Sequence, residues 1–150
     1  FATEPAEVAT LDVPTASVSA SHSIVAIETI TGTVDLLDRE KLGQKVIVEP
    51  AGVSVGADVA AAVPYGSRVV TVAPSGRMQV VDDSGAKDLP GKCPAPSWSL
   101  PTRRAVVFGC GTGAVRVTGG AGDLAVTAMP YPAGAPEQRP DRMQHRDRAD

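Results

Sequence analysis

The chain has 150 residues, with 14 basic and 17 acidic side chains, so its formal net charge is −3 and its pI is about 5.3. This balance excludes a protein that binds nucleic acid through a clustered basic face. Hydrophobic residues make up 43% of the chain, yet no apolar run approaches the roughly 18 residues needed to span a bilayer. With 15 Gly, 13 Pro and only 3% aromatic residues, the composition favours short Val- and Ala-rich strands joined by turns, and therefore an all-β fold.

A pattern of strand, tight turn and second strand occurs three times along the chain. It covers residues 23–38, 68–83 and 104–117, and each copy carries a turn glycine, at Gly32, Gly76 and Gly113. The first strands of the last two copies align when Arg68 is matched with Arg104. The period of about 40 residues is the one expected for a four-stranded blade of a β-propeller.

Further strand patterns flank these hairpins. Residues 58–64 and 98–100 precede the second and third copies, and their small residues suit innermost strands near a central channel. Residues 46–48, 87–89 and 124–128 follow the three copies after polar turns and are expected to be the outer strands.

We therefore predict about three four-stranded blades of a β-propeller over residues 21–132. Residues 1–20, with one strand-like piece at Val8–Val13, are interpreted as a remnant of the preceding blade or a linker. Residues 133–150 carry charges of both signs with few apolar residues, which predicts a disordered tail. Because three blades cannot close a ring of typically four to eight, the expectation is a fragment of a larger ring, and the alternative is an open β-sandwich.

The ends of the chain and its cysteines bear on its compartment. The first residue is Phe1 rather than Met and no signal segment is visible, so the chain is expected to be a piece whose natural terminus and targeting sequence cannot be read. Cys93 and Cys110 lack His or Cys neighbours at metal-ligand spacing. This favours a disulfide in an oxidising compartment over a zinc knuckle, with two reduced thiols in a cytosolic protein as the alternative.

No motif of catalysis or ligand binding stands out in the sequence. Gly109–Gly113 has the spacing G-x-G-x-G and leads into a strand, whereas a nucleotide phosphate needs a helix N-terminus. Ser84–Lys87 matches S-x-x-K without its partner motifs. His22 and His145 are too far apart to form a metal ligand set, and neither accompanies a G-x-S-x-G nucleophile. The acidic pairs are interpreted as solvent-facing strand ends rather than a calcium loop: Asp82 with Asp83, and Asp35 with Asp38.

Several segments together resemble a known family. They are Leu89–Pro96, Ala105–Gly113 and Ala128–Pro132, preceded by Val59–Gly66 and Ile24–Leu42. In this order they are similar to the periplasmic zinc metallochaperone β-propellers of the AztD type, over about residues 24–132. The most specific part is V-F-G-C, ending at Cys110, together with its partner Cys93.

The resemblance implies a periplasmic or secreted protein that binds zinc and passes it to the solute-binding protein of an ABC transporter. It also implies a disulfide between Cys93 and Cys110. This chain has Gly56-Ala57-Asp58 and Cys93–Trp98 where the family places histidine ligands, so no metal ligand is carried over. Asp58 is the one coordinating side chain near a family ligand position.

Two functions are left open by the sequence. One is a non-enzymatic propeller related to zinc metallochaperones and degenerate at the ligands, with no cofactor in this segment and zinc expected only for the full-length protein. The other is a protein-interaction platform without metal. A lipid anchor upstream of Phe1, the number of blades, the partner and the oligomeric state stay open.

Overall fold

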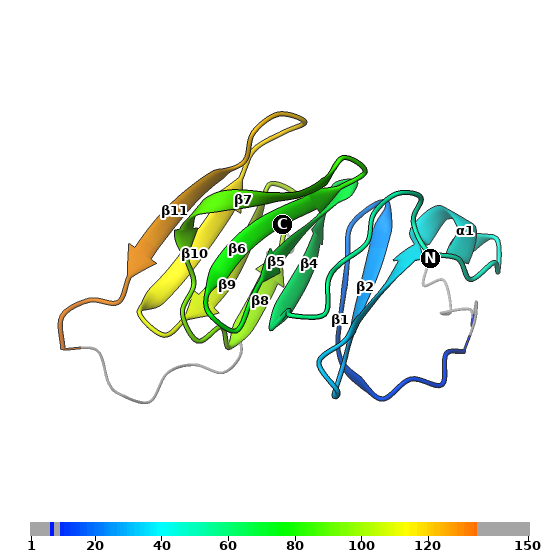
Figure 1. Ribbon diagram of the computed structural model, residues 1–150, viewed down its shortest axis with the longest axis horizontal. Coiled ribbons are helices and arrows are strands. Elements are labelled where there is room, and N and C mark those ends of the chain that lie inside the picture. Colours follow the sequence, from blue (N-terminus) through cyan, green and yellow to red (C-terminus); the bar gives the residue numbers. More distant parts are fainter. Residues whose placement is uncertain (1–6, 8–9, 135–150) are drawn as a thin grey trace, which may run out of the picture.

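The computed structural model describes residue 7 and residues 10–134, which are nearly all-β and form three antiparallel sheets (Figure 1). Most of the predicted tail at residues 133–150 lies outside these residues. The first sheet contains β1 (Thr15–Ala20), β2 (Ile24–Thr29) and β3 (Val34–Asp38), followed by the short helix α1 (Arg39–Gly43). The second contains β4 (Ala61–Tyr65), β5 (Arg68–Val72), β6 (Arg77–Asp82) and β7 (Gly85–Lys92). The third contains β8 (Trp98–Pro101), β9 (Ala105–Cys110), β10 (Gly113–Thr118) and β11 (Ala125–Pro130).

Each sheet is a meander in which every strand pairs with the next along the chain. The strands are rich in β-branched residues, and tight turns join them. Gly32 and Gly76 adopt φ values of 80° and 84° in two of these turns, a backbone conformation that a side chain makes costly. The repeated strand, turn and strand of the sequence is therefore a repeated hairpin in the structure.

The second sheet packs between the other two through its opposite faces. Alternate residues of β5 and β6 point to opposite sides of the sheet, so Val70 and Val80 join a core with the third sheet, whereas Val69 and Val81 join a core with the first. The larger core includes Phe108, which is fully buried. The three sheets thus form one face-to-face stack with the second sheet in the middle (Figure 1).

Equivalent strands of neighbouring sheets lie next to each other. The first strands, β1, β4 and β8, contact one another in that order, and the last strands of the second and third sheets, β7 and β11, are also in contact. This is the arrangement of successive propeller blades, in which first strands line the axis and last strands lie at the rim. The blade-like sheets are consistent with a propeller fragment.

The first sheet differs from the prediction because it has three strands. β1 supplies its first strand from within residues 15–20, while residues 46–48 form no strand. The side chain of Asp38 caps α1 by accepting a hydrogen bond from the Lys41 amide at 3.0 Å, so the chain turns away from the sheet. Afterwards Val48 reaches β3 through one backbone bond, in which its carbonyl accepts from the Asp38 amide.

The alignment of Arg68 with Arg104 is one residue out of register. In a blade stack, the face turned toward the next sheet must be equivalent in every sheet. Val70 faces the third sheet, whereas Val106 faces back toward the second, so Arg68 is equivalent to Ala105. The two turns also differ in length, since residues 73–76 join β5 to β6 and only residues 111–112 join β9 to β10. Gly113 is therefore the first residue of β10, and not a turn residue like Gly76.

Candidate functional site

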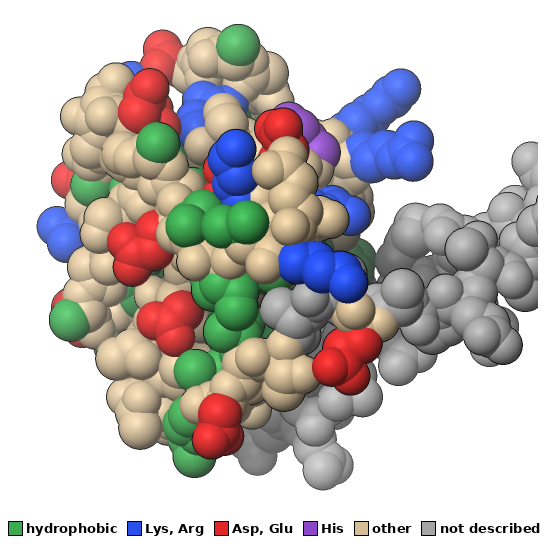
Figure 2. Space-filling model, turned by 90° about the vertical axis from the view of Figure 1, so that its right-hand side faces the viewer, with side chains coloured by type: hydrophobic (Ala, Val, Ile, Leu, Met, Phe, Trp, Pro, Cys, Tyr) green, Lys and Arg blue, Asp and Glu red, His purple; other side chains and the backbone are tan. Residues whose placement is uncertain are grey.

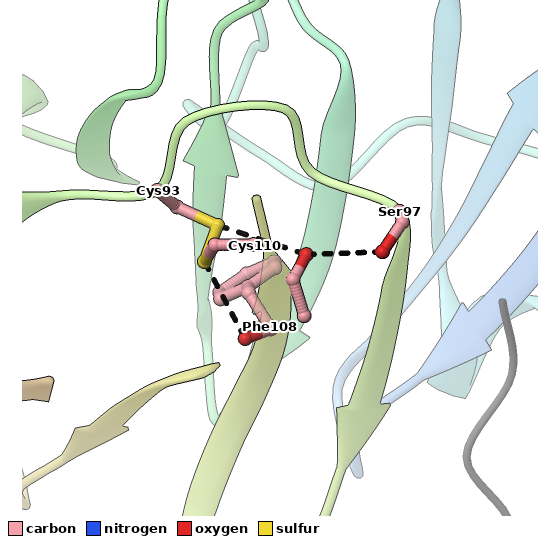
Figure 3. Close-up of a disulfide and its surroundings, with 5 residues drawn as sticks. Cys93, Ser97, Phe108 and Cys110 are labelled. Carbon is pink, nitrogen blue, oxygen red and sulfur yellow. Dashed lines mark hydrogen bonds between the residues drawn. A yellow bond between two sulfur atoms is a disulfide. The ribbon is translucent and has the colours of Figure 1, made fainter. Parts of the chain in front are cut away.

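A disulfide joins the second and third sheets. Cys93 directly follows β7 and Cys110 ends β9; their sulfurs are 1.98 Å apart and their Cα atoms 5.0 Å apart (Figure 3). Both residues are buried, with 0% and 2% of their surface exposed. The bridge therefore belongs to the core between the sheets.

Main-chain contacts hold the bridge in place. The Cys93 amide donates to the carbonyl of Gly76, and the Gly111 amide donates to that of Pro94. The Ser97 hydroxyl donates to the carbonyl of Gly109, while the Cys93 Sγ lies 3.9 Å from the same oxygen (Figure 3). Because a bridged sulfur carries no proton, that last approach is a packing contact.

Gly109, near the end of β9, allows a side chain of the neighbouring strand to pack closely on the backbone. A Cβ on Gly109 would lie 2.1 Å from the indole of Trp98, so the ring of the opposite strand lies directly on the Gly109 backbone. The Trp98 Nε1 is buried without a hydrogen-bond partner among the described residues. The segment Gly109–Gly113 is a strand end, a turn and a strand start, so it offers no helix N-terminus to a phosphate.

Polar side chains also connect neighbouring sheets. The Tyr65 hydroxyl lies 3.0 Å from the carbonyl oxygen of Arg104 and 2.6 Å from that of Gly119, between the second and third sheets. Arg68 donates from its guanidinium to the carbonyls of Gly120 and Gly122. These bonds satisfy turn carbonyls that no strand partner reaches.

Glu28 of β2 connects the first sheet to the second. Its carboxylate accepts from the amide of Ala62 at 2.7 Å and from the hydroxyl of Ser17 at 2.6 Å. The Ser19 hydroxyl donates to the carbonyl of the same Ala62 at 3.3 Å. Both backbone groups of Ala62 on β4 are thus bound by side chains of the neighbouring sheet.

A hollow of about 270 Å³ lies where the first strands of the three sheets meet. Its polar walls are hydroxyls and one carboxylate, that of Glu28. The segment 93–98, where the resembling family places a histidine, contributes Pro96, Ser97 and Trp98. The complete lining is Ser17, Val18, Ser19, Glu28, Ala60, Ala61, Pro96, Ser97, Trp98, Ser99 and Pro101.

The residues of this hollow do not fit a zinc site. Zinc in proteins takes three or four His, Cys or carboxylate ligands. Across the part of the chain that the structure describes, no three His, Cys, Asp or Glu side chains come together in a way that could hold a metal ion. Glu28 already uses both carboxylate oxygens, and Asp58 is exposed in the loop before β4.

The other coordinating candidates lie apart. His22 lies beside Gly66, just after β4 ends, whereas Asp58 precedes the start of β4. Since the five residues of β4 span roughly 16 Å, these two side chains cannot bind one ion together. His145 lies outside the described residues. Asp38 caps α1 and Asp82 accepts from the Ser84 amide, so these acidic residues have local structural roles.

One exposed ion pair connects the rims of the second and third sheets. The Lys87 Nζ lies 2.7 Å from the Asp123 carboxylate. The hydrogen bond between them is the main reason why the pKa of Lys87 is raised and the pKa of Asp123 is lowered. Both side chains are largely in solvent, so the pair marks the rim without forming a buried charge site.

The comparisons with known proteins agree with the fold. No protein-family model matches the chain, and no curated protein matches it. The structure of apo AztD from Citrobacter koseri is similar to it, with a TM-score of 0.65 and 19% identity, over 81% of this chain and 36% of AztD. A crystal structure of Citrobacter koseri AztD gives a TM-score of 0.59 and 19% identity, over 81% and 35%. The chain thus spans little more than a third of these structures, and the likeness is one of fold.

Sequence reasoning did not identify Glu28, Tyr65, Arg68 or Trp98. Glu28, Tyr65 and Arg68 act across sheets, on partners far along the chain, whereas Trp98 packs on Gly109 of the neighbouring strand in its own sheet. The only local signal was a polar or aromatic residue inside an otherwise apolar strand pattern, as at Glu28 and Tyr65. In the described residues no helix is both long and apolar enough to cross a membrane.

Proposed function

We propose that this chain forms blades of a non-enzymatic, periplasmic or secreted β-propeller related to the AztD-type zinc metallochaperones, with the described residues acting as scaffold. The observation that carries this proposal is the fold similarity to AztD over 81% of the chain. The buried Cys93–Cys110 disulfide supports an oxidising compartment. The proposed partner is the solute-binding protein of a zinc ABC transporter, which the resemblance implies.

The scaffold role follows from the side chains in the hollow between β1, β4 and β8. Hydroxyls and a single carboxylate, whose two oxygens each already accept a hydrogen bond, make a poor ligand set for zinc. Zinc handling by the whole protein then depends on residues other than those described. The described residues hold the blades in place and present their surface to a partner.

Calorimetry with two titrants tests the proposal. Titrated with zinc, the chain should show no sub-micromolar binding, while Citrobacter koseri AztD serves as the reference protein. Titrated with a zinc solute-binding protein from an ABC transporter, the chain should show saturable binding. A sub-micromolar zinc site in the chain would contradict the scaffold role, and no binding to the solute-binding protein would contradict the proposed partner.

The second candidate is a protein-interaction platform without metal. It is favoured by the exposed large hydrophobic residues around the first sheet, among them Val18 and Ile30, which are 61% and 72% exposed. Figure 2 shows apolar side chains gathered on this side of the molecule. If the chain binds neither zinc nor the solute-binding protein, this candidate is favoured over the first.

A further inference from the structure

One edge of the stack carries the turns that join the first two strands of each sheet. These turns comprise residues 21–23, 66–67 and 102–104. The Ser21 hydroxyl donates to the Gly66 carbonyl at 2.6 Å, which connects the first turn to the second. The Tyr65 hydroxyl, just before the second turn, lies 3.0 Å from the carbonyl oxygen of Arg104 in the third. The three turns therefore form one continuous surface, in the order of the sheets.

These three turns contain basic residues and no acidic ones. His22 lies in the first turn, and Arg103 and Arg104 lie in the third; all three are exposed. Arg39, the first residue of α1, reaches the same surface, because its guanidinium donates to the carbonyl of Ser21. We call His22, Arg39, Arg103 and Arg104 the basic row.

No carboxylate neutralises the basic row within the part of the chain that the structure describes. The one ion pair of that part joins Lys87 to Asp123 at the rim. Arg39 binds a neutral carbonyl, which leaves its charge uncompensated. Unpaired charges of one sign that lie together create a local potential, and this potential attracts groups of the opposite charge. The basic row is therefore a surface suited to an anionic partner, although the chain as a whole has a net charge of −3.

The acidic side chains of the same edge lie farther out, toward the rim. Asp83 lies in the turn between β6 and β7, and Asp123 in the turn between β10 and β11, while Glu40 lies in α1 after β3. All three are exposed. They would repel a long polyanion such as nucleic acid, or a flat anionic membrane, that covered the whole edge. A short acidic segment that lies along the basic row avoids them.

We propose that the basic row binds an acidic segment of a partner protein, a run of Asp or Glu side chains that crosses the three turns. Packed sheets lie about 10 Å apart, so the row extends over roughly 20 Å, the length of about six extended residues. The guanidinium groups of Arg103 and Arg104 suit carboxylates, because each can donate two parallel hydrogen bonds to one carboxylate. The inference concerns the charge of the partner's surface and does not depend on zinc handling.

Fluorescence anisotropy with a rhodamine-labelled hexaglutamate peptide tests the proposal. Titration with the 150-residue chain should give saturable binding at low salt, and about 0.5 M salt should weaken it because exposed charges are then screened. The double variant Arg103→Ala with Arg104→Ala should weaken binding by about fivefold or more, since it removes two charge pairs. The matched control is Arg77→Ala with Lys92→Ala. It removes two exposed, paired basic residues from the opposite edge of the second sheet and should leave binding within about twofold.

Circular dichroism of each variant establishes that it is folded. A chain that does not bind the peptide at low salt would overturn the proposal. So would an equal loss of binding in the two double variants, because the attraction would then depend on total charge and not on the basic row. Tighter binding of a single-stranded oligothymidylate than of the peptide would contradict the choice of a protein segment as ligand. The zinc and solute-binding protein titrations have separate readouts, so their failure is distinguishable from failure here.

Discussion

At the scale of single residues, the inter-sheet contacts depend on side chains that bind backbone groups of the neighbouring sheet. Glu28 is the clearest case, because its carboxylate accepts the amide of Ala62 on β4. A strand at the inner edge of a sheet has backbone groups with no strand partner, and such groups are costly when partly buried. Glu28 and Ser19 together satisfy both groups of Ala62.

Replacing Glu28 by Ala should lower the free energy of unfolding by about 1–3 kcal/mol, since the Ala62 amide loses its acceptor. Glu28→Gln should cost less, because the amide oxygen can still accept that bond. Urea titration followed by circular dichroism measures both. The control is Glu49→Ala, at an exposed position, and an equal loss in this control would contradict the role of Glu28.

Gly109 is restricted by a different contact. A methyl group there would lie 2.1 Å from the Trp98 ring, so Gly109→Ala must displace the indole and should cost about 1–3 kcal/mol. Trp98 is the only tryptophan of the chain, so its fluorescence maximum should shift in the folded variant. Gly120→Ala is the control, because a Cβ there meets nothing within 4 Å. An unshifted spectrum with unchanged stability would show that the ring does not lie on Gly109.

The Lys87–Asp123 pair should matter little to stability. The lowered pKa of Asp123 means that its contribution is present above the ordinary pKa of Asp and is lost as the pH falls through the lowered value. The raised pKa of Lys87 means that its contribution is present below the ordinary pKa of Lys and is lost as the pH rises through the raised value. Because both groups are exposed, Asp123→Asn should leave the thermal midpoint at pH 7 unchanged within error. A clear drop would mean that the rim contact is tighter than this exposure indicates.

At the scale of elements, the disulfide replaces hydrogen bonds that separate sheets cannot form. The bridge links residues 17 apart and should contribute roughly 3 kcal/mol by restricting the unfolded chain. Urea midpoints measured with and without reductant should differ accordingly, and the variant Cys93→Ala with Cys110→Ala should match the reduced protein. A double variant as stable as the oxidised chain would contradict this contribution.

The elements also show what sequence reasoning can reach. The hairpins were predictable because their strands alternate and their turns carry glycine at close spacing, as at Gly32 and Gly76. The register between blades was not, because matching Arg68 to Arg104 by letter ignores which face each strand buries. The missing fourth strand of the first sheet was also hidden, since Val46-Ile47-Val48 has a strand composition and only the cap at Asp38 diverts the chain.

At the scale of the whole molecule, the two junctions between sheets are unequal. The junction between the second and third sheets has the larger core, the disulfide and the bonds of Tyr65 and Arg68. The junction between the first and second sheets has the smaller core and the contacts of Glu28 and Ser19. The second and third sheets should therefore behave as one cooperative unit.

Hydrogen exchange measured by mass spectrometry can test this inequality. Amides of β5 and β9 should exchange slowest, and those of β1–β3 should exchange sooner, as a group. Reduction of the disulfide should speed exchange in β9 more than in β2. Equal protection of all three sheets would show that the stack unfolds as one unit.

The architecture was more accessible to sequence reasoning than the site. A stack of blades follows from a repeat of about 40 residues and from apolar faces that need neighbours. The hollow between β1, β4 and β8 depends on three segments that meet only in the folded chain, so no local spacing indicates it. The chemistry of this hollow can therefore be judged only from the side chains that the folded structure places around it.

The disulfide also closes a covalent loop of residues 93–110, and this loop contains the whole of β8. Within this loop the turn after β8 exposes Arg103 and Arg104, and trypsin can cleave the peptide bonds that follow them. A cut there leaves two polypeptides still tethered through sulfur, so the nicked molecule runs as a single species until it is reduced. The strand at the inner edge of the third sheet can thus lose its backbone connection to β9 while the two pieces of the protein remain one molecule.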